Sequence, residues 1–214
     1  MIIKQLFLDE FNKRYGSEVR KYKIGEYHVS SLLGSCLKAN VNSWRIKLMD
    51  KNLQDLTKLH FFRGIMTHEF LQKLKVWDDI EAECKREIKT THGKITLLGH
   101  ADAVKGDTVF EFKSVIRIPW KPKFDHSMQV NAYATMLGLP RAKVIYIGND
   151  ADGNYNVKEF DLVQSDFMWQ LLVNKAITLH ALLKTGTDVQ CSCRSRVHDI
   201  AWIQYLDTLK SKKK

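Results

Sequence analysis

The sequence predicts a protein that mixes helices and strands, of the α/β or α+β class, and three observations lead to this prediction. Residues 1–76 place apolar side chains three or four positions apart, which is the spacing of amphipathic helices. Residues 81–115 then alternate between apolar and polar side chains and are divided by short polar turns, as strands are. Beyond them, helical and strand-like segments follow one another.

The helical opening divides into three segments. Residues 2–14 have helical spacing, and a second helix is expected to start after Ser30 or Ser31 and to run through Trp44 and Leu48. A third is expected over residues 57–76. We therefore expect an N-terminal helical region over residues 1–76.

The strand-like part predicts an antiparallel meander. Residues 81–89, 94–104 and 108–115 have strand character, with turns at Gly93 and at residues 105–108. The later expected elements are a helix over 126–137, strands over 143–148 and 156–163, and a helix over 165–183. A chain of 214 residues without an extended linker is expected to form a single domain, with a core over residues 77–185 and a C-terminal segment over 186–214.

The charge balance favours polyanionic partners. The chain has 34 Lys and Arg against 24 Asp and Glu, a formal net charge of +10, which suits nucleic acid or an anionic membrane surface. No segment approaches the roughly 20 apolar residues of a membrane-spanning helix, and the N-terminus lacks the apolar stretch of a signal peptide. We expect a cytoplasmic, intracellular protein that does not act at membranes, in which cysteines are thiols or metal ligands rather than disulfides.

Two carboxylates are expected to meet on the predicted meander. If Val104 and Val109 close a hairpin, Asp102 lies directly opposite Glu111 on the same face of the sheet. Because side chains alternate along a strand, Lys113 shares that face. Phe110 and Phe112 then point the other way, into a core.

This pattern of charges is suited to phosphodiester hydrolysis. Opposed carboxylates repel each other unless a cation lies between them, and Mg²⁺ or Mn²⁺ prefers carboxylate oxygens. A bound divalent ion lowers the pKa of a coordinated water, and Lys113 would add positive charge at the scissile phosphate. The alternative is a solvent-facing hairpin with ordinary surface charges.

The loop after the catalytic strand has a composition suited to single-stranded nucleic acid. Basic and aromatic side chains alternate there with prolines, and they suit phosphate contacts and base stacking: Arg117, Trp120, Lys121 and Lys123. A solvated loop with one packed Trp is the alternative.

Four ordered motifs carry a family resemblance: Gly64-Ile-Met-Thr-His68-Glu69, Gly99-His-Ala-Asp102, Glu111-Phe-Lys113 and Gln129-Val-Asn-Ala-Tyr133. Together they resemble the RecB-like branch of the PD-(D/E)XK nucleases, and more closely its CRISPR-associated branch, the Cas-four exonucleases, in which that fold carries an iron–sulfur cluster. The match spans residues from about 30 to 198. The resemblance implies an α/β fold with a restriction-endonuclease-like core, in which a mixed central sheet is flanked by helices.

The resemblance also implies roles for individual residues and an activity. His68, Asp102, Glu111 and the carbonyl of Phe112 would be ligands of Mg²⁺ or Mn²⁺, and Lys113 would be the catalytic lysine. Gln129 and Tyr133, four apart on one helix face, would help to bind DNA near the site.

The expected activity is that of a 5′-to-3′ exonuclease acting on single-stranded DNA, with endonuclease activity as a second expectation. CRISPR adaptation proteins are the implied partners, and an oligomer is left open. A RecB-like nuclease of viral or repair origin fits the same motifs. A non-catalytic DNA-binding scaffold is the alternative from another class.

The cysteines resemble the cluster ligands of that family only in part. One cysteine near the N-terminus joins three near the C-terminus there, and Cys36, Cys191 and Cys193 occupy those regions. The Cys191-Ser-Cys193 spacing is tighter than usual and no final cysteine follows. The fourth ligand of the expected [4Fe–4S] cluster is therefore His198 or Cys84, with zinc or no metal as alternatives.

Overall fold

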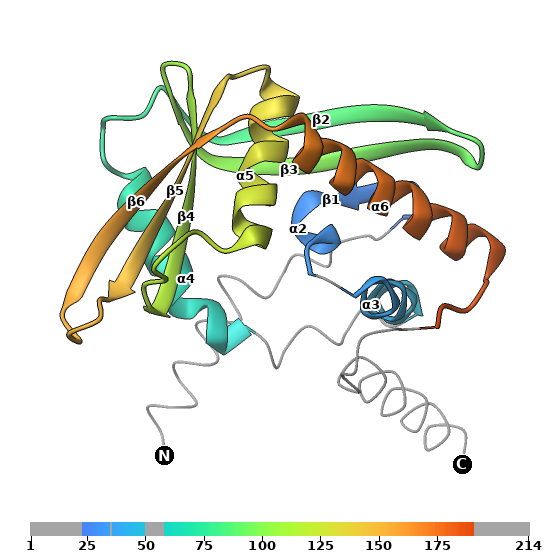
Figure 1. Ribbon diagram of the computed structural model, residues 1–214, viewed down its shortest axis with the longest axis horizontal. Helices are drawn as coiled ribbons and strands as arrows, with labels where there is room; N and C mark the ends of the chain where they lie inside the picture. Colours follow the sequence, from blue (N-terminus) through green and yellow to red (C-terminus); the bar gives the residue numbers. More distant parts are fainter. Residues whose placement is uncertain (1–22, 35, 50–57, 191–214) are drawn as a thin grey trace, which may run out of the picture.

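The computed structural model describes residues 23–34, 36–49 and 58–190. The predicted helix over residues 2–14, together with Cys191, Cys193 and His198, lies outside the described residues. The elements of the described part are, in chain order (Figure 1), β1 (Glu26–His28), α2 (Val29–Leu32), α3 (Leu37–Met49), α4 (Lys58–Gln72), β2 (Asp79–Thr90), β3 (Gly93–Lys105), β4 (Thr108–Arg117), α5 (Phe124–Leu137), β5 (Arg141–Asn149), β6 (Tyr155–Val163) and α6 (Asp166–Thr185).

The strands form a six-stranded sheet with both parallel and antiparallel neighbours. β2 pairs antiparallel along most of β3, and β3 and β4 are antiparallel, which confirms the predicted meander. β1 pairs with β3 in parallel, β4 pairs with β5 in parallel, and β5 and β6 are antiparallel. The predicted fold class, α/β with a mixed central sheet flanked by helices, is confirmed.

Helices cover both faces of the sheet, and each face has its own apolar core. On one face α5 and α6 pack over a large cluster that includes Leu97, Val144 and Leu172. On the other face α4 contacts β4, and a smaller cluster there contains Phe112 and Ile145. Because β5 is covered on both sides, its middle residues are almost all buried, whereas β6 at the sheet edge is mostly exposed. No described helix has the length and apolar character needed to cross a membrane.

The prediction of one continuous helix from Ser30 or Ser31 through Leu48 is wrong. α2 ends at Leu32, and α3 begins only at Leu37. Between them Gly34 has a φ of +94°, a conformation that L-residues rarely adopt and that ends a helix.

The N-terminal region is also not purely helical, because it contains the short strand β1. Its residues pair in parallel with Thr96–Leu98 of β3, and the Thr96 N–H donates to the carbonyl of Gly25 at 2.7 Å. Three residues are too few to show the alternation of a strand, so only the tertiary pairing reveals it.

Candidate active site

The candidate site lies where β3 has no strand partner on one of its edges. β2 occupies one edge of β3 along most of its length. The opposite edge pairs with β1 over Thr96–Leu98 and with β4 over Ala103–Lys105. No described strand pairs with residues 99–102 on that edge, and these residues are the Gly99-His-Ala-Asp102 motif. The fold therefore opens a gap at the motif that ends in Asp102.

The predicted pairing of Val104 with Val109 is confirmed. The strand pairing ends at Ala103 and Phe110, one step short of the expected Asp102–Glu111 pair. One step further, the N–H of Phe112 donates to the side-chain Oδ2 of Asp102 at 2.6 Å. A carboxylate thus takes a backbone hydrogen bond of β4, which fixes Asp102 in the gap.

Glu111 and Lys113 project toward α5, as the strand period predicts. The Nζ of Lys113 lies 2.5 Å from Oε1 of Glu111 and 2.9 Å from Oε1 of Gln129 on α5. Gln129 in turn donates to the hydroxyl of Tyr133 at 3.1 Å. Gln129 and Tyr133 are buried, so in this structure their contacts hold Lys113 rather than reach into solvent.

Tyr133 packs directly on Gly99. A Cβ built at Gly99 would lie 2.3 Å from Cε1 of the Tyr133 ring, closer than real Cβ atoms approach a neighbour. The absence of a side chain at this position therefore admits the tyrosine ring. This contact links the first residue of the Gly99–Asp102 motif to the helix that holds Lys113.

His68 approaches the same two strands from α4, on the other face of the sheet. Its Nδ1 lies 3.3 Å from Oδ1 of Asp102, and its Nε2 lies 2.8 Å from the carbonyl oxygen of Phe112. Both partners are acceptors, so the doubly protonated ring satisfies both. Burial lowers the pKa of His68, but the hydrogen bond and negative charge of Asp102 raise it further, so the pKa lies above its ordinary value.

Glu111 is the most unusual acid of the site. Its side chain is 2% exposed, and Oε2 has no hydrogen-bond partner among the described residues. Burial, followed by the negative charge of Asp102, raises the pKa of Glu111 from 4.5 to about 7, although Lys113 lowers it. Burying a carboxylate oxygen without a hydrogen-bond partner destabilises the folded state, unless a cation or a hydrogen-bond donor contacts that oxygen.

The sequence-based predictions missed two residues beside Asp102. On β2, Ile80 pairs with Ala103 and Ala82 with Ala101 of β3, so Glu81 of β2 lies opposite Asp102. Glu81 has a φ of +52°, and Gln72 of α4 donates both to its carboxylate at 2.5 Å and to the carbonyl of Asp102 at 3.3 Å. A left-handed non-glycine residue in a strand has no sequence signal, but such outliers cluster at functional sites.

A hydrogen-bonded anchor fixes the start of α5. The hydroxyl of Tyr146 on β5 accepts from the N–H of Lys123 at 3.0 Å and lies 2.7 Å from Nδ1 of His126. Burial, followed by the charge of Lys113, lowers the pKa of His126 to about 4, so the ring is neutral and its Nδ1 accepts a hydrogen bond from the Tyr146 hydroxyl. This contact ties the first turn of α5 to the middle of the sheet.

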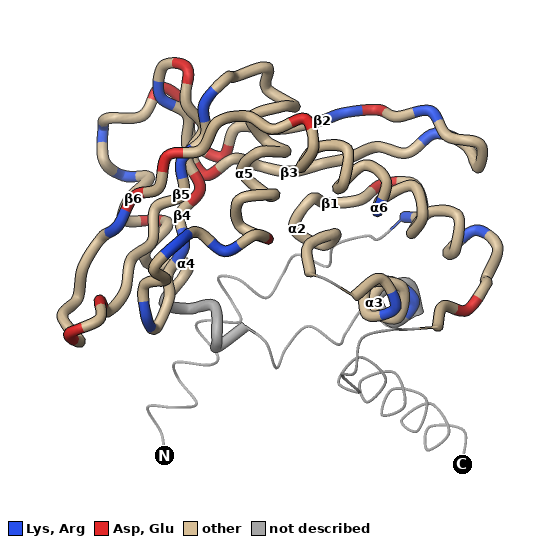
Figure 2. The backbone as a smooth tube through the Cα atoms, viewed as in Figure 1, with Lys and Arg blue, Asp and Glu red and all other residues tan. Residues whose placement is uncertain are grey.

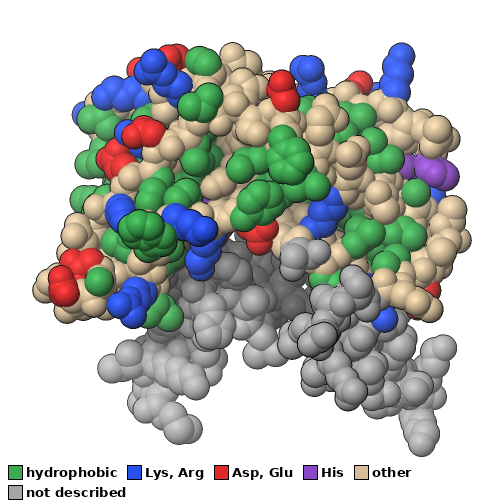
Figure 3. All heavy atoms as spheres, viewed as in Figure 1, with side chains coloured by type: hydrophobic (Ala, Val, Ile, Leu, Met, Phe, Trp, Pro, Cys, Tyr) green, Lys and Arg blue, Asp and Glu red, His purple; other side chains and the backbone are tan. Residues whose placement is uncertain are grey.

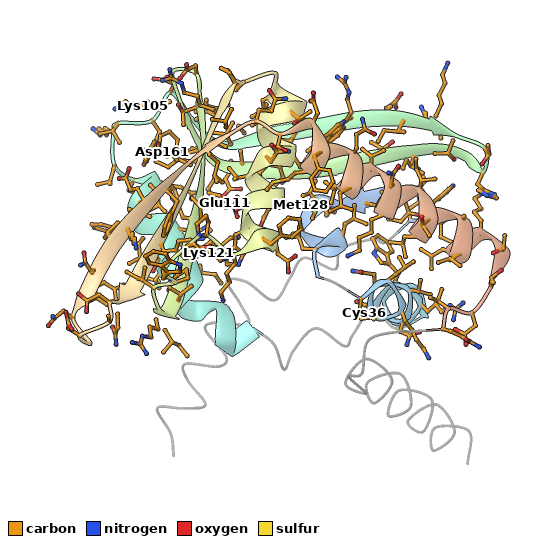
Figure 4. The ribbon with its side chains drawn as sticks, viewed as in Figure 1. Cys36, Lys105, Glu111, Lys121, Met128 and Asp161 are labelled. Carbon is orange, nitrogen blue, oxygen red and sulfur yellow. The ribbon has the colours of Figure 1, made fainter. Side chains whose placement is uncertain are left out.

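The four predicted contacts of the loop after β4 are exposed. Trp120 has 85% of its surface accessible, so the alternative of a packed Trp is wrong. Arg117, Lys121 and Lys123 are also exposed, and Figure 4 shows Lys121 beyond the end of β4.

The two described cysteines differ in environment. Cys84 is buried in β2, its thiol donates to the carbonyl of Ala82 at 3.4 Å, and burial raises its pKa to about 12. Cys36 is half-buried and lies just before α3 (Figure 4). Arg45 of α3 donates to the carbonyls of Gly186 and Thr187, which holds the chain that leads to residue 190 against this helix.

Comparison with known proteins supports the fold. No protein-family model matches the sequence, and no curated protein is significantly similar to it. The crystal structure of SSO0001 superposes with a TM-score of 0.64 at 19% identity, covering 83% of this chain and 86% of that one.

Exonucleases are also found among the solved structures that resemble the chain. An alkaline exonuclease (LHK-Exo) from Laribacter hongkongensis gives a TM-score of 0.41 at 12% identity, over 96% of this chain and 100% of that one. Its complex with dAMP gives 0.42 at 12% identity, over 89% and 96%. Of these likenesses, the one to SSO0001 shows a shared fold.

Proposed function

We propose that this chain is a divalent-metal-dependent DNA nuclease with a PD-(D/E)XK-type site. The observation that supports this most directly is the buried Glu111 oxygen without a hydrogen-bond partner, next to Asp102 and Lys113 at the gap in the sheet. The order of the motifs, Asp102 on β3 followed by Glu111 and Lys113 on β4, is the order in which such a nuclease presents its acids and its lysine. The likeness to SSO0001 shows the fold and does not by itself assign an activity.

The donor groups fit a hard divalent ion. Carboxylate oxygens of Asp102 and Glu111 and the carbonyl of Phe112 are the ligands that Mg²⁺ and Mn²⁺ prefer, and His68 offers an imidazole nitrogen. Among the described residues, no group of three or more His, Cys, Asp or Glu side chains is arranged to hold a metal ion. His68 bonds to Asp102 and to the carbonyl of Phe112, and Lys113 bonds to Glu111, so the protein's own side chains meet these oxygens. Loading the site therefore requires both to give up contacts.

The chain's own residues would then position and polarise a phosphodiester. When bound, the divalent ion supplies positive charge at the phosphate and lowers the pKa of water. Lys113, held by Gln129, places an ammonium where negative charge develops on the phosphate. Glu111, whose second oxygen has no partner among the described residues, would supply a carboxylate oxygen to the ion. Hydrolysis would leave 5′-phosphate and 3′-hydroxyl ends.

The finer assignment is a RecB-like, Cas-four-type exonuclease. We propose 5′-to-3′ degradation of single-stranded DNA, with endonuclease activity in addition, in CRISPR adaptation or in viral or repair DNA processing. The motifs His68 to Tyr133 support this assignment, and they serve the CRISPR and the viral or repair roles equally.

The test is cleavage of end-labelled single-stranded and duplex DNA with Mn²⁺, Mg²⁺ or EDTA. The wild type should cut only with metal, and Lys113→Ala should cut more slowly by a factor on the order of 100 or more. Lys105→Ala, an exposed lysine at the β3–β4 turn, is the matched control and should keep the wild-type rate. Binding of DNA without cutting under every condition would instead favour the scaffold function. End-label position gives the polarity.

We also propose an iron–sulfur cluster held by Cys36, Cys191, Cys193 and a fourth ligand. The proposal is supported by Cys36 opening the helix against which Arg45 holds the segment that precedes Cys191. Cys84 is the weaker candidate for the fourth ligand because burial keeps its thiol protonated, so we favour His198. Anaerobically purified protein should be brown and contain iron; Cys36→Ser should lose both, while Cys84→Ser should keep both. Colourless, iron-free wild type would refute the cluster.

A further inference from the structure

A hollow of about 710 Å³ lies at the far end of β4, away from the described charges of the candidate active site. One wall is the end of β4 and the loop after it, with Arg117 and Trp120, and the other is the β5–β6 turn and the start of β6, with Asp150, Asp152 and Lys158. Figure 3 shows basic, acidic and apolar side chains together over these strand ends, at the lower left. The tube in Figure 2 shows basic positions following one another in this part of the chain.

Three hydrogen bonds to backbone carbonyl oxygens join the two walls. The N–H of Ile118 donates to the carbonyl of Asn149 at 2.7 Å. The guanidinium of Arg117 donates to the carbonyl of Ala151 at 3.5 Å, and Lys158 donates to the carbonyl of Trp120 at 3.3 Å. The hollow is therefore formed before any ligand enters, which lowers the entropic cost of binding.

Trp120 is the unusual side chain of this hollow. It is 85% exposed and its backbone carbonyl accepts from Lys158, so its indole presents a large apolar face to water from a loop that is held at its backbone. Indole is amphipathic and stacks well on flat rings, and every nucleobase has such a face. An exposed, anchored Trp is suited to stacking an unpaired base.

The hollow carries two basic and two acidic side chains, Arg117 and Lys158 beside Asp150 and Asp152. Arg117 and Lys158 stand in the hollow, and the exposed Lys121 follows Trp120. The carboxylate of Asp150 accepts from the N–H groups of Asp152 and Asn154 at 3.0 and 2.9 Å, so this acid shapes the turn. Arg117 and Lys158 bond to uncharged carbonyl oxygens, which leaves each of them further N–H groups that can meet phosphate oxygens.

We propose that this hollow seats one unpaired nucleobase of single-stranded DNA, stacked on Trp120 with the flanking phosphates at Arg117 and Lys158. The inference rests on the proposed nuclease function and names a substrate-binding position for it. β4 carries both Lys113 and Arg117, and four strand steps span at most about 13 Å, with a register shift between Ser114 and Arg117. A single strand bound at Lys113 therefore needs only a few nucleotides to reach the hollow.

The test is fluorescence anisotropy of a labelled single-stranded thymidine oligonucleotide in EDTA, where no cleavage occurs. Trp120→Ala should weaken binding roughly 5- to 100-fold, and Trp120→Phe should restore most of the affinity because it keeps an aromatic face. Phe167→Ala, which removes a 72% exposed aromatic side chain from α6, is the matched control and should bind as the wild type does. Circular dichroism confirms that each variant is folded.

A second oligonucleotide identifies stacking as the cause. Replacing the bases by abasic sites should weaken binding to the wild type and leave Trp120→Ala unaffected. Equal affinity of wild type and Trp120→Ala for the oligonucleotide would overturn the proposal even if metal-dependent cleavage is intact. The same loss of affinity for the abasic oligonucleotide in both proteins would also overturn it. Conversely, a Trp120-dependent affinity in a protein that never cuts would uphold the hollow and refute the nuclease. A wild type without affinity for single-stranded DNA refutes the hollow, whereas the cleavage assay with metal decides the nuclease separately.

Discussion

Adding one methyl group at Gly99 should destabilise the protein through the ring of Tyr133. The new Cβ of Gly99→Ala would lie 2.3 Å from Cε1, 3.1 Å from Cζ and 3.2 Å from Cδ1 of that ring. Tyr133 is 3% exposed and hydrogen-bonded to Gln129, so it has no solvent-facing position to move to. Overpacking of this kind costs about 1–3 kcal/mol, and here it also displaces the residues that hold Lys113.

The matched control is the same substitution where the methyl group has room. Gly64 lies in α4, and nothing lies within 4 Å of a Cβ built there. Gly64→Ala should therefore stabilise the protein by about 0.5–1 kcal/mol, because alanine favours a helix interior over glycine. The same chemical change is thus expected to have opposite signs at the two positions.

Urea unfolding measures both effects from the shift of the midpoint at constant slope. The cause is isolated by a double-mutant cycle with Tyr133→Leu, in which the ring atoms that clash are absent. Gly99→Ala should cost markedly less in that background than in the wild type. The reasoning is refuted if Gly99→Ala is as stable as the wild type, or if its cost is the same in both backgrounds.

Three further predictions concern charge, metal and the start of α5. Because burial and Asp102 raise the pKa of Glu111 from 4.5 to about 7, the folded metal-free protein retains a proton that the unfolded chain has released. The free energy of unfolding should therefore fall as pH rises from about 4.5 to about 7. Melting temperatures measured over this range should change less with pH for Glu111→Gln than for the wild type, and parallel curves for the two proteins would contradict the raised pKa of Glu111. Mn²⁺ should raise the melting temperature of the wild type but not of Asp102→Asn, since only an intact ligand set gains from the ion; an equal rise would exclude Asp102 as a ligand. Tyr146→Phe, which removes the hydroxyl bonded to Lys123 and His126, should cost about 1–2 kcal/mol in urea unfolding, and an unchanged midpoint would show that this anchor contributes nothing.

Local pattern was enough to predict the parts of the site that depend on one hairpin. The turn between β3 and β4 sets the pairing of Val104 with Val109, and the period of two then places Lys113 beside Glu111. Helical spacing likewise places Gln129 one turn from Tyr133. These relations need only the chain's own periodicity.

Relations between distant elements had no such signal. The gap at residues 99–102 exists because β1 and β4 take different stretches of the same edge of β3, and β1 has only three residues. The positive φ of Glu81 and the contact of Gly99 with Tyr133 arise from the packing of β2 and α5 around this gap. The positions of α4 and α5 on opposite faces are likewise a property of the whole fold.

The gap also explains how residues on opposite faces of the sheet meet at one site. A complete sheet would separate His68, which comes from α4, from Lys113, which bonds to α5. Where β3 and β4 part, His68 instead reaches the carboxylate of Asp102 and the carbonyl of Phe112, while Lys113 neutralises Glu111. Because His68 must lose a proton to offer a nitrogen to a metal, and its pKa lies above the ordinary value, metal affinity should rise with pH through the titration of His68. Because Glu111 titrates near neutrality as well, a His68→Gln variant should lose only the part of that pH dependence that comes from the imidazole. An unchanged pH dependence in Mn²⁺ titrations of His68→Gln would exclude His68 as the group that competes with the ion.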